Sequence, residues 1–450
     1  MSRSPLSPPD RGPARPTLPR SELLAEITCA FKPSAEGEAG LRVGIEAELI
    51  AVATEGGERL ALDPAEPGRP GLHELIARTA KELGGRIGPG PHGAPLAHVP
   101  GVGVFCFEPG GQIELSTAAF RSVDRLIDAT GGAMRALARN AEPMGITLVT
   151  RGMDPGRPVA DVPFVLDAER YRKQRAHYQR IGPWGTRMML LSAGFHVNVD
   201  FGSHPARRWQ IANRLAPILT ALFANSPDEP GSVEAGTRST GAAGNAIRST
   251  RAGHWRKLDP SRTGLFADVR QEGRDTGAAQ EEYLAFALGA HDFLGRPEGA
   301  LSRPFRESWE DGADLASWRA HLTTLFPEVR PRGYLELRSV DALRPAWYAV
   351  PVVVAVGILY DPRTLAAAHE ILPPATEALL EEAGRRGVTD EHLRARALDA
   401  IDLALSGARA LGPGLVGEWS LERTEEFRRR FTAAGRDPGH EPDGIDLFEP

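Results

Sequence analysis

The chain has 450 residues, of which 41% are hydrophobic and 25% charged, a composition typical of a soluble globular protein with one large core or two domains. Its formal net charge of −6, without a basic cluster interleaved with aromatic residues, argues against a nucleic-acid partner. Two cysteines, Cys29 and Cys106, are too few for a disulfide framework and favour a reducing compartment.

The first 20 residues, MSRSPLSPPDRGPARPTLPR, are predicted to be a disordered tail because Pro, Arg and Ser dominate them. They lack the apolar core of a secretory signal peptide. The longest apolar run, 346–360, is too short to span a bilayer and contains Pro351, so we expect a buried helix there. These features predict a cytoplasmic protein with no membrane partner.

Helices and strands are both predicted between residues 21 and 360. Helices are expected at 21–31, 72–84, 121–142, 167–180, 205–224, 280–294, 314–325 and 345–359. Strands are expected at 41–53, near 145–150, at 189–201 and 333–340, and as two pieces in GVFCFEPGGQIELS, with a loop at 88–101. This order favours one α+β domain over 21–360, a helical C-terminal part at 361–435 and a loose tail at 436–450.

Residues 226–279 are rich in Gly, Ser, Thr and Arg and show little periodicity. A loop of that length in a compact chain is usually functional or disordered. Three of its cations, Arg251, Lys257 and Arg262, are candidates for binding nucleotide phosphates. A solvated basic loop would have the same composition.

Polar side chains recur on one face of each predicted strand, since side chains alternate with period two. The sets are Glu46 and Glu48; Gln112 and Glu114, with Glu108 just before them; His196, Asn198 and Asp200; and Glu336 and Arg338. One such strand alone would fit the solvent-facing side of a sheet. Glutamates on neighbouring strands repel, however, so their recurrence favours a bound cation.

Hard oxygen ligands with an occasional imidazole suit Mg²⁺ or Mn²⁺. Magnesium keeps water and substrate phosphates as its other ligands, so the pattern predicts a polynuclear site for nucleotide phosphates. The chain has no Walker A motif and no dinucleotide glycine spacing. A bound ATP would therefore be held by metal ions and arginines.

Five stretches in order resemble the glutamate–cysteine ligases, within the glutamine-synthetase-like carboxylate–amine ligases. They are GIEAEL, FEPGGQIELS, RMMLLSAGFHVNVDF, LTALFANSP and HLTTLFPEVRPRGYLELRSVDALRP, and LDPSRTG at 258–264 also fits. The likeness covers about 40–360 and is strongest to the plant and proteobacterial type, with the actinobacterial ergothioneine-pathway enzymes next. It implies a curved antiparallel sheet forming a funnel, with helices packed outside.

The resemblance implies ligation of L-glutamate to L-cysteine with ATP and Mg²⁺ (Mn²⁺ possible), through γ-glutamyl phosphate, for glutathione or ergothioneine biosynthesis. The implied metal ligands are Glu46, Glu48, Glu108, Glu114, His196 and Glu336. His196 departs from the Gln usual in plant-type relatives, but SAGFHVN is similar to an S-G-x-H-x-N context that holds a metal-binding histidine in another bacterial branch.

The resemblance also implies roles for polar residues beside these acids. Arg338 and Glu336 are expected to act on the transferring phosphate. Arg248, in AIRST, is expected to hold a substrate carboxylate, with Asn198 and Gln112 as further substrate-binding residues.

Two alternatives stay open. LSAGF replaces the T-C-T stretch of plant relatives, so a different amine could be the acceptor. A non-catalytic binding protein on this scaffold would be expected to have lost metal ligands, whereas all five glutamates are intact. The sequence predicts a monomer or homodimer without choosing between them.

Overall fold

An antiparallel sheet forms the centre of the computed structural model, which describes residues 18–32, 36–64, 66, 68–90, 93–154, 157–228, 247–266 and 275–441. The strand order is β10-β11-β7-β1-β5-β4-β3-β2, and β6 pairs with β1. The strands are β1 Val43–Ala53, β2 Arg86–Pro89, β3 Pro95–Val99, β4 Gly103–Phe107, β5 Ile113–Thr117, β6 Ile146–Val149, β7 Gly194–Val199, β10 Val329–Pro331 and β11 Leu335–Asp341, with β8 His291–Asp292 and β9 Arg303–Pro304 as a separate pair. The predicted α+β class with an antiparallel sheet is confirmed.

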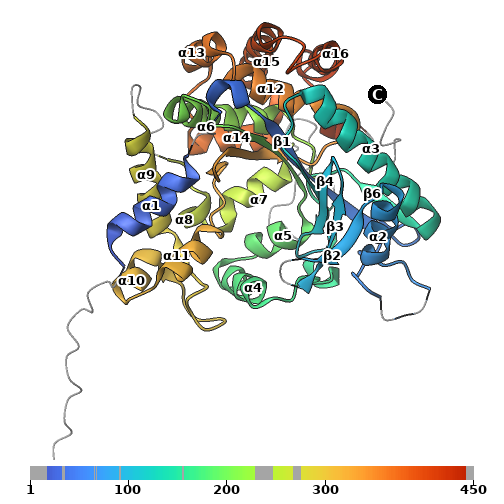
Figure 1. Cartoon of the computed structure of the whole chain (residues 1–450). Helices are drawn as coiled ribbons and strands as arrows, with labels where there is room; N and C mark the ends of the chain where they lie inside the picture. Colours follow the sequence, from blue (N-terminus) through green and yellow to red (C-terminus); the bar gives the residue numbers. More distant parts are fainter. Residues whose placement is uncertain are drawn as a thin grey trace, which may run out of the picture.

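Helices surround this sheet (Figure 1). They are α1 Arg20–Ala30, α2 Leu72–Glu82, α3 Val123–Ala141, α4 Glu169–Ile181, α5 Trp184–Leu191, α6 Pro205–Leu222, α7 Thr250–Leu258, α8 Pro260–Thr263, α9 Thr276–Gly289, α10 Phe305–Glu310, α11 Leu315–Leu322, α12 Ala349–Leu359, α13 Pro362–Ile371, α14 Glu377–Arg386, α15 Glu391–Leu411 and α16 Glu418–Phe427. Helices α2, α3, α6 and α12 pack against the sheet. The polar side chains of the strands lie on the opposite face of the sheet.

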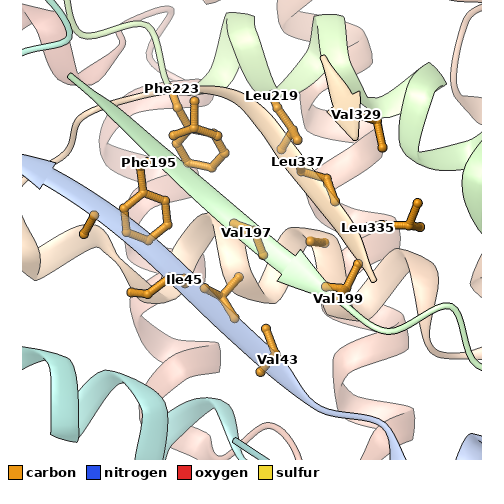
Figure 2. Close-up of a cluster of buried hydrophobic side chains, with 14 of the residues drawn as sticks. Val43, Ile45, Phe195, Val197, Val199, Leu219, Phe223, Val329, Leu335 and Leu337 are labelled. Carbon is orange, nitrogen blue, oxygen red and sulfur yellow. The ribbon is translucent and has the colours of Figure 1, made fainter. Parts of the chain in front are cut away.

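The apolar face of the sheet is built by alternate residues of its central strands. Figure 2 shows Ile45 of β1, Val197 of β7 and Leu337 of β11 packed in one cluster with Leu219 of α6 and Phe223, and all five are buried. Burying one such side chain stabilises the fold by about 1.5–3 kcal/mol. Because side chains alternate, this burial fixes the direction of the polar residues between them.

The strand register brings acidic residues of distant segments together. Glu46 pairs with His196, and Glu48 pairs with Glu114. Glu336 pairs with Asn198 on the neighbouring strand. The faces predicted from alternation therefore lie on one surface of the sheet.

Several predicted boundaries are wrong for local reasons. The loop expected at 88–101 is mostly the hairpin of β2 and β3. The strand expected to start at 189 starts at Gly194, because the apolar run before it continues helix α5. The loop expected over 226–279 contains α7, whose N-terminus is capped by the Ser249 side chain accepting from the Ala252 N–H.

The C-terminal helices share the core of the sheet domain. Helix α12 is buried along its whole length and packs on α15 so closely that a Cβ on Gly357 would lie 2.1 Å from the Ala404 carbonyl oxygen. A Cβ on Gly407 would lie 1.9 Å from the Gly357 carbonyl oxygen. Both positions therefore require glycine. The division at residue 361 stays a prediction.

The N-terminal and C-terminal tails predicted from the sequence lie partly outside the described residues. The N-terminal tail at 1–20 is described only from residue 18, and α1 begins at Arg20. Residues 436–441, placed in a loose tail by the sequence, are packed, with Asp437 fully buried. Among the described residues no single helix is both long and apolar enough to cross a membrane; only the bent pair Pro345–Leu359 and Pro362–Ile371, broken by 96°, reaches that length and composition together.

Candidate active site

A cavity of about 460 Å³ opens on the polar face of the sheet. Strand β1, strand β5 and the turn before β5 supply its acidic residues, β7 and β11 add His196 and Arg338 to this floor, and α4, α5 and α7 supply its walls. Its lining includes Glu46, Glu48, Glu108, Gln112, Glu114, Arg170, Tyr171, Met188, Met189, His196, Arg251, Trp255, Phe326, Arg330, Arg332, Tyr334 and Arg338. The cavity is thus acidic at the sheet, and basic and aromatic around it.

The first acidic group consists of Glu46, His196 and Glu336, with ligand atoms within 4.8 Å of one another. The Nδ1 of His196 lies 2.9 Å from Oε2 of Glu46 and 3.8 Å from Oε1 of Glu336. Burial and Glu336 favour the protonated form of Glu46, but the hydrogen bond with His196 and the charges of His196 and Arg330 together outweigh them and lower the pKa of Glu46. Glu46 is therefore held as a carboxylate at the bottom of the cavity.

Two arginines neutralise Glu336 in this group. Arg330 forms a bidentate pair with it, with Nη2 at 2.9 Å from Oε1, and Nη1 of Arg338 donates to Oε1 at 2.9 Å. Burial opposes the charge of Glu336, but the two arginines hold the pKa of its carboxyl well below the usual range. The Nε of Arg338 is buried without a hydrogen-bond partner among the described residues. That donor is available to an anionic ligand.

The second acidic group consists of Glu48, Glu108 and Glu114, again with ligand atoms within 4.8 Å. Burial and the charge of Glu48 raise the pKa of Glu108 to about 8. Burial and the charge of Glu46 raise the pKa of Glu114 well above its ordinary value. In the described part of the chain none of the three carboxylates forms an ion pair with a cationic side chain. Three half-buried acids without an ion-pair partner need either protons or a hard cation, so this group fits a divalent ion.

The turn between β4 and β5 places Glu108 beside Glu114. The Gly111 N–H donates to the Glu108 carbonyl at 2.8 Å, and Gly111 has φ of +79°. A Cβ on Gly110 would lie 2.4 Å from the Leu190 carbonyl oxygen. The two glycines of the PGG run are therefore required for the turn that brings the acids together.

Of the predicted substrate-binding residues on these strands, Gln112 lines the cavity and Asn198 contacts Glu46, which lines it. Asn198 donates from Nδ2 to Glu46 at 3.1 Å, and its buried Oδ1 has no hydrogen-bond partner among the described residues. Gln112 accepts from the Gly110 N–H at 3.0 Å and donates to the Ser192 carbonyl at 2.7 Å. The Gln112 amide thus links the turn to the residue that follows α5, and its substrate-binding role stays a prediction.

Of the four cations predicted in the 226–279 segment, only Arg251 lines the cavity. Arg262 is fully buried and donates to Asp259 and to the Thr324 carbonyl, both at 2.8 Å. Lys257 lies over the Trp184 ring at 4.7 Å, and Arg248 pairs with Asp437. Arg248, Lys257 and Arg262 therefore lie outside the cavity lining, and their binding roles stay predictions.

Helical spacing explains why Arg251 lines the cavity and Lys257 does not. Arg251, Trp255 and Leu258 line the cavity, and they follow one face of α7 at positions i, i+4 and i+7. Lys257 lies two positions from Trp255 and so projects from another side of the helix. The sequence predicts a loop over residues 226–279, so this helical spacing was not expected there.

Sequence reasoning missed most of the wall residues. Arg330 lies on β10 directly opposite Glu336 of β11. The turn between these two strands contains Gly333, with φ of +78°, and this glycine is the feature of the sequence that indicates the hairpin. The guanidinium carbons of Arg251 and Arg338 lie 5.4 and 5.2 Å from the centroid of the Trp255 ring. The electron-rich ring therefore contacts both cations that line this side of the cavity.

Acid sensitivity is expected from His254 on α7. Its side chain packs on Trp184, and burial, followed by the charges of Arg187 and Lys257, lowers the pKa of His254 to about 3. The unfolded chain takes up a proton below about pH 6.5 and the folded chain does not, so stability falls as pH drops from that value, by about 2 kcal/mol at pH 5. Urea unfolding at pH 7 and pH 5 measures this loss, and His254→Gln should reduce it; an unchanged difference in the variant would contradict the assignment.

The sequence and the fold both have known relatives. The profile of glutamate–cysteine ligase family 2 (GCS2) matches residues 42–414. The chain is 31% identical over 333 residues to glutamate–cysteine ligase EgtA of Mycolicibacterium smegmatis, covering 70% of this chain and 74% of that protein. It is 30% identical over 351 residues to the chloroplastic glutamate–cysteine ligase of Nicotiana tabacum, covering 73% of this chain but only 64% of that protein.

Solved structures share the fold at low sequence identity. The glutamate–cysteine ligase of Francisella tularensis, in complex with AMP, matches with a TM-score of 0.51 and 12% identity over 89% of this chain and 83% of that one. A bifunctional glutathione synthetase from Pasteurella multocida matches with a TM-score of 0.50 and 15% identity over 94% of this chain and 50% of that one. These likenesses concern the fold alone.

Proposed function

Because this chain belongs to the glutamate–cysteine ligase family, we propose that it forms γ-glutamylcysteine from L-glutamate, L-cysteine and ATP. The observation that supports this most directly is the pair of acidic groups, Glu46/His196/Glu336 and Glu48/Glu108/Glu114, on one floor beside the open donor of Arg338. A phosphoryl-transfer site needs concentrated countercharge and fixed orientation more than a covalent intermediate on the protein.

The reaction has two steps. An oxygen of the glutamate γ-carboxylate forms a bond to the γ-phosphorus of ATP, and the bond from that phosphorus to the bridging oxygen breaks, releasing ADP. The cysteine nitrogen then bonds to the activated γ-carbon, the carbon–oxygen bond to phosphate breaks, and the nitrogen loses a proton. The products are the amide, ADP and inorganic phosphate.

Mg²⁺, or Mn²⁺ in its place, is the cofactor that these groups would hold. Glu46, His196 and Glu336 form one ligand set, and Glu48, Glu108 and Glu114 form the other. When bound, the ions supply positive charge to the phosphate oxygens and orient them. Asn198 adds a carbonyl oxygen next to the first set.

Arginines hold the anionic groups of the substrates. Arg338 would bind the transferring phosphoryl group through donors left without a partner among the described residues, such as Nε, while Glu336 and the Trp255 ring fix its guanidinium. Arg251, on the same wall, is placed to bind a substrate carboxylate or phosphate. The binding roles of Arg248, Lys257 and Arg262, which lie outside the cavity lining, stay predictions from the sequence.

Apolar side chains limit the access of water to the acyl phosphate. Met188, Met189, Trp255 and Phe326 line the wall away from the acids. Excluding water there protects the intermediate from hydrolysis before the amine arrives. A cytoplasmic location and a monomeric or homodimeric state remain predictions from the sequence.

The test is incubation with ATP, Mg²⁺, glutamate and pooled amino acids, followed by identification of the product by mass. We expect ADP release that depends on both glutamate and cysteine, and a dipeptide with the mass of γ-glutamylcysteine. A dipeptide with another amine would identify a different acceptor, the alternative kept from the sequence. ADP release without any dipeptide would contradict ligation.

A further inference from the structure

The last described residues of the chain fold back onto the start of α7. Asp437 is fully buried, and its carboxylate accepts from Nε and Nη2 of Arg248 at 2.9 and 2.6 Å. Burial alone would raise the pKa of Asp437, but the hydrogen bonds from Arg248 and His440 lower it. The pair is therefore charged, bidentate and shielded from water, which is the strong form of this interaction.

A second set of contacts secures the same segment. Glu441 pairs with Arg344 at 2.9 Å and with Arg430 at 2.6 Å. Arg151 donates to the carbonyls of Gly439 and Glu441 at 3.3 and 2.6 Å. Residues 437–441, which we call the C-terminal clasp, are thus held by side chains from four separate parts of the chain.

The clasp contacts the chain at Arg248, two residues before α7 begins at Thr250. Arg248 lies next to the N-cap residue Ser249, whose hydroxyl donates to Asp341 of β11 at 3.0 Å. The Arg248 N–H donates to the carbonyls of Gly384 and Arg385 at the end of α14. The start of α7 is therefore fixed between the sheet on one side and the clasp on the other.

Three residues after Arg248, the same helix sends Arg251 into the cavity, and Trp255 follows one turn later. Asp437 itself does not line the cavity, so it cannot touch a substrate there. A small rotation at the first turn of α7 would nevertheless move both cavity residues. Displacements of about 1 Å at a reacting group can lower a rate by about a hundredfold.

We propose that Asp437 is a positioning residue of the ligase reaction: through Arg248 it sets the direction in which Arg251 and Trp255 enter the active site. This role gives the C-terminal segment a function beyond packing. Its kinetic consequence rests on the proposed function; its structural consequence does not.

The kinetic test compares Asp437→Asn, Arg248→Gln and the double variant. If the two residues act as a pair, each single change lowers kcat/KM about tenfold and the double change lowers it no further. If Arg248 bound the substrate directly, Arg248→Gln would lose far more than Asp437→Asn. Asp402→Asn is the matched control, since Asp402 forms a bidentate pair with Arg428 on the surface, away from α7.

Hydrogen exchange followed by mass spectrometry provides a readout independent of activity. In Asp437→Asn, peptides covering 249–258 should exchange faster, whereas those covering 349–359 should exchange as in the unmodified protein. Faster exchange in both regions would show general destabilisation, and unchanged exchange in 249–258 would show no link between the clasp and α7; either result overturns the proposal. A protein that ligates nothing would refute the proposed function and still give this measurement a clear answer.

Discussion

Glu114→Gln is expected to lower kcat for ADP release by about 10³-fold or more, with Mg²⁺, glutamate and cysteine all saturating. Glu114 lies in the half-buried group with Glu48 and Glu108, where no cationic side chain of the described residues pairs with it. A neutral amide of the same shape keeps the packing but loses the charge that would hold a divalent ion. Glu82→Gln, on an exposed acid paired with Arg139, is the control and should leave kcat unchanged.

Thermal unfolding of Glu114→Gln provides a second test, in which the variant is expected to gain stability although it loses activity. Without divalent ions, Glu114→Gln should unfold at a higher temperature than the unmodified protein, because one of three crowded carboxyls has been replaced. Added Mg²⁺ should raise the unfolding temperature of the unmodified protein and raise that of the variant less. A variant with near-normal kcat, or an equal response to Mg²⁺, would contradict the ion site.

Arg338→Met is expected to lower kcat by about 10³-fold, the loss typical of removing an arginine that contacts a transferring phosphoryl group. The fold should persist, because Arg330 still pairs with Glu336. Arg338→Lys keeps the charge but loses the planar contact with the Trp255 ring, so it should recover only part of the rate.

Rapid-quench measurement of ADP formation in one turnover separates this effect from product release. Arg363→Met, at an exposed arginine of α13, is the control. If Arg338→Met kept more than about a tenth of the single-turnover rate, the contact with the phosphoryl group would be excluded, since an arginine finger is worth at least about 10³.

The acidic floor could be predicted from the sequence because strand alternation is a local property. Once Ile45 and Leu337 face the core, Glu46 and Glu336 must face the other way. The two groups that the structure assembles contain all six predicted metal ligands. Alternation does not predict the strand register. The register is what places Glu48 opposite Glu114.

The walls could not be predicted in the same way. Arg251 and Arg262 are eleven residues apart in a basic segment, and nothing local distinguishes a cavity residue from a buried one that binds Asp259. The difference arises from how α7 packs on β11 and α14 and how α8 packs on α9, which is a tertiary property. Likewise, the partner of Arg248 lies 189 residues further along the chain.

The acidic floor also bears on how the chain assembles. If β1 paired with β5 one residue out of register, Glu46 and Glu48 would turn into the apolar layer beside Leu219 and Phe223, and Ile45 would turn into the cavity. Several unpaired charges buried among hydrocarbon would make such a misfolded sheet far less stable than the native one. The residues proposed for catalysis therefore also select the correct strand alignment during folding, before any substrate is present.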